Sequence, residues 1–113
     1  MIHKVSYHMS RVTSLIQGAV AQIIAREIKD PAIGMITVTN VEVSKDQAIA
    51  KVYVLVHDES QKNRALKTIK ILAKTIRHQL AEKVQLRKTP ELHFFYDDVA
   101  SQGIRISQLL DSR

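Results

Sequence analysis

The sequence MITVTNVEVSKDQAIAKVYVLV, residues 35–56, consists of two β-branched segments separated by a short polar stretch. Alternation of apolar with polar residues is typical of strands that bury one face. In the second segment the small and branched residues that share one face are Ala48, Ala50, Val52, Val54 and Val56. Two strands joined so closely predict an antiparallel hairpin with its turn at residues 44–47.

The alternation in the first segment changes phase near its middle. Ile36 and Val38 share one parity, whereas Val41 and Val43 share the other. A one-residue bulge at Thr39-Asn40 reconciles them, because successive strand residues point to opposite faces. In the turn, Ser44 and Asp46 are predicted to be structural, since an aspartate in such a turn accepts hydrogen bonds from nearby backbone N–H groups.

A helix is predicted before this hairpin. Its apolar residues recur with helical period, as Val12, Leu15, Ile16, Ala19, Ile23, Ile24 and Ile28. Ser10 is a plausible N-cap. The residue before a proline is disfavoured in the α conformation, so Asp30-Pro31 is expected to end the helix.

The second half of the chain adds helix and one more strand. Residues 57–61, HDESQ, read as a capping segment before a basic helical region, and ELHFFYD, residues 91–97, reads as a third strand. GIRISQLL, residues 103–110, is predicted to form a last short helix. The order helix, strand, strand, helical segment, strand predicts an α+β domain, with the helices packed on one face of a small sheet.

Length and composition restrict the class of protein. A chain of 113 residues with 45% apolar and 25% charged residues is expected to form one domain with its own core. Because there is no cysteine, disulfides, thiol catalysis and Cys-based metal sites are excluded. The apolar runs are far shorter than the ~18 residues of a membrane helix, and no signal peptide is recognisable. We therefore expect a cytoplasmic protein, and nothing in the sequence indicates an obligate dimer, so a monomer is expected.

Positive charge is concentrated in one region. The formal net charge is +6, and the segment from Lys62 to Lys88 holds nine Lys/Arg with Glu82 as its one acid. Within KTIKILAKTIRHQL, residues 67–80, four cations recur at helical spacing: Lys67, Lys70, Lys74 and Arg77. A localised basic surface is typical of polyanion binders. The alternative is a solvated basic face without a partner. A helix at a membrane surface is disfavoured, because such helices usually carry Trp or Phe at the apolar boundary and residues 62–84 have only Ile, Leu, Val and Ala there.

The sequence gives little support to an enzyme. The five histidines contain no i, i+4 pair and no metal-ligand spacing, and there is no phosphate-binding or nucleophile motif. Asp97 and Asp98 are adjacent, so on a strand they point to opposite faces and are better explained by a strand-ending turn. His57-Asp58 is likewise assigned to a turn. We expect no catalytic residue, no metal, no cofactor and no small-molecule substrate.

Nucleic acid is the partner class that fits best. Stacking on single-stranded bases needs exposed aromatic residues, but aromatics are 4% of the chain. Phe94 and Tyr96 have the parity of the third strand that points at the helices, so they are predicted to be core. The basic stripe therefore favours contact with phosphates and RNA shape over recognition of splayed bases.

Two longer motifs resemble one family. These are D-P-x-I-G-x-x-T-V-T-x-V-x-V-S-x-D, from Asp30 to Asp46, and L-R-x-x-P-E-L-x-F, from Leu86 to Phe94. Together with GIRISQLL they resemble ribosome-binding factor A, a family of small bacterial assembly factors, from about Val12 to Leu110.

The resemblance implies a fold and a function. It implies a type II KH-like domain of order α-β-β-α-(kink)-α-β with a mixed three-stranded sheet, spanning residues 1–113 with a core of about 10–110. It also implies binding to the immature small ribosomal subunit and its rRNA. The protein would assist late maturation and 5′-end processing of that rRNA without cleaving it, in the setting of cold adaptation. A generic basic RNA-binding or interaction module is the alternative.

The family lacks the G-x-x-G loop of KH domains, and the three dispersed glycines of this chain cannot form one. The family has a helix kink in its place. In the family this kink lies at an A-x-G segment. Aligned on Ile76-Arg77, the segment corresponds to Leu72-Ala73-Lys74, which lacks both the alanine and the glycine of the pattern in that register, although Ala73 lies one residue away. An unbroken helix over residues 60–84 is the competing expectation.

Six residues are predicted to bind RNA. Arg77 and Arg87 match the family motifs, whereas Lys70 and Lys74 come from the helical stripe, and Lys83 and Lys88 come from the basic run around it. Two alternatives stay open: Arg87 could pair with Glu91, and Lys83 could simply be solvated.

Overall fold

The computed structural model describes residues 2–102, with side chains from residue 11 onward. Within this range no helix is long and apolar enough to cross a membrane. The expected helix at residues 103–110 lies outside the described residues. The elements are α1 (Ile2–Glu27), β1 (Ile36–Val43), β2 (Ile49–Val56), the 3₁₀ turn η1 (Glu59–Gln61), α2 (Lys62–Ile71), α3 (Ala73–Lys83) and β3 (Glu91–Tyr96). This is the predicted α-β-β-α-kink-α-β order.

The predicted hairpin and its bulge are confirmed. β1 and β2 pair antiparallel, and the register shifts between Val38, which faces Val54, and Asn40, which faces Tyr53. The extra residue, Thr39, lets Val38 and Val41 both reach the buried face. The bulge is thus required by the apolar pattern of β1.

The hairpin turn is held by Asp46, as predicted. Its Oδ1 atom accepts hydrogen bonds from the backbone N of Ala48 at 3.0 Å and from the Ser44 hydroxyl at 2.8 Å. These two bonds, the backbone one first, and then the charge of Lys88 lower the pKa of the Asp46 carboxyl below its ordinary value. Ser44 and Asp46 therefore have the structural role that the sequence assigned to them.

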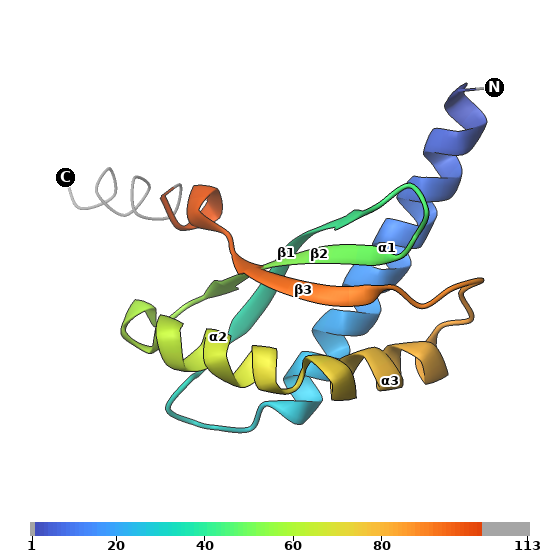
Figure 1. The fold of residues 1–113 in the computed structure, drawn as a ribbon. Helices are drawn as coiled ribbons and strands as arrows, with labels where there is room; N and C mark the ends of the chain where they lie inside the picture. Colours follow the sequence, from blue (N-terminus) through green and yellow to red (C-terminus); the bar gives the residue numbers. More distant parts are fainter. Residues whose placement is uncertain (1, 103–113) are drawn as a thin grey trace.

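β3 completes a mixed sheet of order β1-β2-β3 by pairing parallel to β2. Parallel neighbours need a crossover connection, which η1, α2 and α3 provide. All three helices lie on one face of the sheet, as predicted, with α1 packed on β1, and α2 and α3 packed on β3 (Figure 1). The fully buried large side chains between the layers include Ile16, Ile23, Val52, Val54, Ile69, Ile76 and Leu80. Phe94 is buried and Tyr96 is half-buried, so both belong to the core side as expected.

The predicted start of the first helix is wrong. α1 begins at Ile2, eight residues before Ser10, which therefore lies inside the helix and is not its N-cap. No glycine or proline interrupts residues 2–9, so the backbone has no residue there that disfavours continuation. At the other end α1 stops at Glu27, three residues before Asp30-Pro31. A side-chain network joins this end of the helix to α3, because Gln79 of α3 donates to Glu27 at 2.6 Å and accepts from Arg26.

β3 ends at Tyr96, directly before Asp97-Asp98, but the predicted turn is wrong, because helical residues follow from Asp98 and Asp97 precedes them. Asp97 is also connected to the bulge. The Thr39 hydroxyl donates to Asp97 Oδ2 at 2.6 Å, and the backbone N of Ala100 donates to Asp97 Oδ1 at 3.0 Å. The Thr39 bond, followed by the backbone bond, lowers the pKa of the Asp97 carboxyl below its ordinary value of 3.8. The carboxylate thereby links the bulge of β1 to the end of β3.

We predict that Thr39→Val reduces stability in a pH-dependent way. A depressed folded-state pKa contributes stability that is present above the unfolded-state pKa and is lost as the pH falls through the folded-state value. At pH 7 the substitution is expected to lower the free energy of unfolding by about 1 kcal/mol, the loss of one hydrogen bond. As the pH falls below 3.8, the difference from wild type becomes smaller, because Asp97 is then increasingly protonated. Urea unfolding of both proteins at pH 7 and at pH 2.5 measures this difference in the free energy of unfolding.

Thr39→Ser is the control, because it keeps the hydroxyl and is expected to keep the pH dependence. A Thr39→Val deficit of the same size at pH 7 and at pH 2.5 contradicts the link to the charge of Asp97.

Candidate nucleic-acid interface

The basic segment is broken into two helices at Leu72. This residue has φ −86° and ψ 1°, and it separates α2 from α3. The predicted kink at Leu72–Lys74 is therefore confirmed, and the unbroken helix is wrong. Ile69 before the break and Ile76 after it are both fully buried. Leu72 and Ala73 are partly buried and pack against the same core. The break between the helices therefore occurs where the segment contacts the core.

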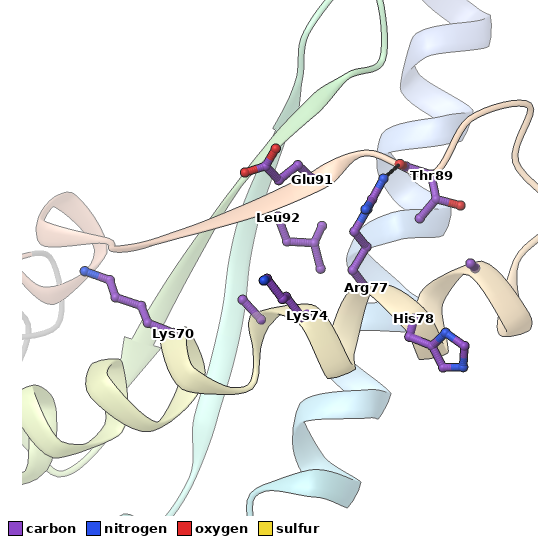
Figure 2. Close-up of a pocket in the computed structure, with 9 residues that line it drawn as sticks. Lys70, Lys74, Arg77, His78, Thr89, Glu91 and Leu92 are labelled. Atoms are coloured by element: carbon purple, nitrogen blue, oxygen red, sulfur yellow. Dashed lines mark hydrogen bonds between the residues drawn. The ribbon is translucent and has the colours of Figure 1, made fainter.

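A groove lies between the broken helix and β3. Its cavity measures about 750 Å³, and the charged residues that line it are Lys70, Lys74, Arg77 and Glu91. Leu92 and the small side chains of Ala73 and Ala81 provide apolar and open parts of the wall. Figure 2 shows Lys70 and Arg77 reaching from the helices toward the side where β3 runs. A second hollow of about 260 Å³ shares Lys70, Ala73 and Leu92 and extends the groove along β3.

Lys70 and Lys74 are exposed cations without an ion-pair partner among the residues that the structure describes. Glu91, the carboxylate of the groove, lies 3.3 Å from His93. Two other cations of the basic segment are in ion pairs: Arg64 lies 2.6 Å from Asp30, and Lys62 lies 3.8 Å from Asp98. Lys62 also stands over the Tyr96 ring, 4.2 Å from its centroid. Within the basic segment, other exposed cations without an ion pair among the described residues are Lys67, Lys83, Arg87 and Lys88, but they do not line this groove, whereas Lys70 and Lys74 do.

Arg77 lines the same groove but binds the protein's own backbone. Its Nη2 donates to the carbonyl of Thr89 at 2.9 Å, and its Nε donates to the carbonyl of Pro90 at 3.2 Å. Figure 2 shows the guanidinium extending from α3 to the segment that carries Thr89. Helical spacing predicted Arg77 on the same stripe as Lys70 and Lys74, but it did not indicate these contacts with the protein's own backbone.

The other three predicted residues do not line the groove. Lys83 is the last residue of α3, and Arg87 and Lys88 lie in the connection from α3 to β3; all three are exposed. Lys88 is near enough to the hairpin turn for its charge to act on Asp46. The suggested pair of Arg87 with Glu91 is absent from the described ion pairs, in which Glu91 is joined to His93. The six residues therefore form two groups, one in the groove and one at its far end.

Sequence reasoning missed several residues of this surface. Lys67 belongs to the helical stripe and lines an adjoining hollow with Lys70 and the exposed Ile71, yet it was not among the predicted RNA ligands. Its position in the i, i+3 series was the available signal. His78, Thr89 and Leu92 also line the groove. They come from separate elements, so no local spacing in the sequence brings them together.

The chemistry of this surface is that of an anion-binding groove. Within residues 11–102 there is no cluster of His, Cys, Asp or Glu side chains that could hold a metal ion. Exposed lysines over a groove with small and apolar walls are suited to a sugar–phosphate chain, because the ammonium groups neutralise phosphates while the walls admit the backbone.

Comparison with known proteins identifies the family. Residues 8–110 match the profile described as "Ribosome-binding factor A". Ribosome-binding factor A of Nitrosospira multiformis is 45% identical over 102 residues, which cover 89% of this chain and 81% of that protein. The protein of the same name from Pseudomonas fluorescens is 38% identical over 104 residues, covering 89% of this chain and 78% of the relative.

Solved structures agree with this relationship. The crystal structure of ribosome-binding factor A from Thermus thermophilus superposes with a TM-score of 0.70 at 27% identity, covering 78% of this chain and 94% of that one. A homology model of the Thermus thermophilus factor, fitted into the cryo-EM map of a 30S–RbfA complex, gives a TM-score of 0.64 at 28% identity, covering 74% and 88%. The fold is KH-like, and the chain belongs to the ribosome-binding factor A family.

Proposed function

We propose that this protein binds the immature small ribosomal subunit through its rRNA and assists late maturation of that RNA. The observation that carries the proposal is the pair of exposed, unneutralised lysines, Lys70 and Lys74, at a groove formed by the broken helix and β3. Family membership gives the partner, because a relative has been placed in a 30S complex. The groove offers a place for the rRNA backbone, because lysines at helical spacing can contact successive phosphates.

The finer parts of the proposal follow from the same family resemblance. The protein assists 5′-end processing without cleaving RNA itself, acts in the cytoplasm as a monomer and contributes to growth in the cold. The whole chain, residues 1–113, works as a single KH-like domain. Lys70 and Lys74 contact phosphates directly, and Arg77, Lys83, Arg87 and Lys88 extend the basic surface toward the end of α3.

We predict that Lys70→Ala/Lys74→Ala loses selective binding to small ribosomal subunits. Each phosphate contact removed makes the log–log salt dependence of binding shallower by about 0.7 to 0.9, so the pair accounts for roughly 1.5. Co-sedimentation with purified small and large subunits over a series of salt concentrations measures both selectivity and slope. Circular dichroism checks the fold of the variant.

Lys45→Ala/Lys51→Ala is the matched control. It removes the same charge from the hairpin turn and from the face of β2 that points away from the helices, where both lysines are exposed. We expect this control to bind nearly as wild type does. Equal binding of wild type to both subunits contradicts the assembly role and leaves a generic basic RNA-binding module. Selective binding that survives in Lys70→Ala/Lys74→Ala moves the interface elsewhere.

We further predict that a carboxylate placed in the groove weakens binding more than a neutral side chain of the same shape. Ala81 is exposed on α3 and lines the groove, so Ala81→Glu and Ala81→Gln change its charge and its size separately. At low salt Ala81→Glu is expected to bind several-fold more weakly than Ala81→Gln, and the difference shrinks as salt screens the charge. Equal binding of the two variants at low salt argues against RNA in this groove.

A further inference from the structure

The guanidinium of Arg77 is directed at two successive backbone carbonyls where the chain enters β3. The distances are 2.9 Å from Nη2 to the Thr89 oxygen and 3.2 Å from Nε to the Pro90 oxygen. The contacts span 12 and 13 residues of sequence and join α3 to the start of the edge strand. These two hydrogen bonds use two of the five N–H donors of the guanidinium.

The hydrogen bond to the Pro90 carbonyl is partly buried, whereas that to the Thr89 carbonyl is exposed. Pro90 is fully buried and has no N–H, and β3 begins only at the next residue, Glu91, whose N donates to Ala48 O at 2.8 Å. Backbone carbonyls in such a place need donors. A planar guanidinium fork can reach two neighbouring carbonyls at once, whereas the ammonium of a lysine has no such fork.

The segment that Arg77 holds carries two cations of the basic surface. Residues 84–90 begin at Val84, whose N donates to Leu80 O at 2.9 Å, and Leu86 packs against the core near the middle. Arg87 and Lys88 follow and are exposed. Arg77 therefore holds the C-terminal end of this segment, at Thr89 and Pro90, directly after Arg87 and Lys88.

We propose that Arg77 is a positioning residue of the RNA-binding surface: by bridging the carbonyls of Thr89 and Pro90 it fixes residues 84–90 against α3 and so sets where Arg87 and Lys88 stand relative to Lys70 and Lys74. This rests on the proposed function for its consequence in binding. The competing role, a phosphate ligand, needs only the positive charge of residue 77 and not its fork.

Arg77→Lys separates the two roles, because it keeps the charge and removes the fork. Binding to small ribosomal subunits is measured over a series of salt concentrations, together with amide hydrogen exchange of the free protein. We expect affinity to fall about tenfold and the log–log salt slope to become shallower by up to roughly 1.5, as if the contacts of Arg87 and Lys88 were lost. Exchange at residues 86–92 is expected to become faster.

Arg64→Lys is the matched control, since it is the same charge-conserving change at an exposed arginine of α2 that pairs with Asp30 and does not line the groove. It is expected to leave the affinity, the salt slope and the exchange of residues 86–92 as in wild type. In an Arg87→Ala/Lys88→Ala background, Arg77→Lys is expected to weaken binding no further, because the side chains that it positions are already gone.

Three results overturn the proposal. The first is wild-type affinity and slope in Arg77→Lys while Arg77→Ala loses about one phosphate contact, which makes Arg77 a ligand. The second is additivity of Arg77→Lys with Arg87→Ala/Lys88→Ala. The third is unchanged exchange at residues 86–92 in Arg77→Lys, which disproves the tie whether or not the protein prefers small subunits. Lack of such a preference in wild type contradicts the proposed function, and the double-variant comparison is then made on isolated rRNA.

Discussion

The burial of Ile69, Ile76 and Leu80 against the sheet determines where the positive charge of this protein stands. Each of the three is fully buried. Burial of a large aliphatic side chain stabilises the fold by about 1.5–3 kcal/mol, whereas neighbouring like charges on a helix repel by a few tenths of a kcal/mol. The apolar side of the segment therefore fixes its orientation, and Lys70 and Lys74 are held on the outer side despite their mutual repulsion.

The parallel pairing of β3 with β2 adds a second constraint. The chain must cross the sheet and return, and α2 and α3 together make that crossover beneath β3. The break at Leu72 lets the residues on both sides of it pack against the core. The groove lies where α3 passes alongside the edge strand β3. Because α3 and β3 are joined by a short segment without regular structure, the contacts of Arg77 with Thr89 and Pro90 fix the return of the chain.

Local pattern predicted most of the fold, because the deciding interactions are periodic in sequence. The phase change between Val38 and Val41 was sufficient to predict the bulge, and alternation predicted the face of β2 that is buried. The start of α1 was not predictable from Ser10, since a serine that can cap a helix can equally lie inside one. In the site, helical spacing grouped Lys70, Lys74 and Arg77 correctly. The hydrogen bonds of Arg77 to carbonyls 12 and 13 residues away were not predictable, because no local sequence pattern indicates them.

The carboxylates explain why the surplus charge stays on one side. Many of them serve the fold: Asp46 holds the hairpin turn, Asp97 joins the bulge to the end of β3, and Asp30 pairs with Arg64. Acids fixed in turns and short ion pairs cannot move to neutralise the lysines of the groove. Under the proposed function, a polyanion would approach from the side of α2 and α3, because nine of the Lys/Arg residues lie between Lys62 and Lys88. The hydrogen bonds that stabilise the turns would then also affect how that partner docks.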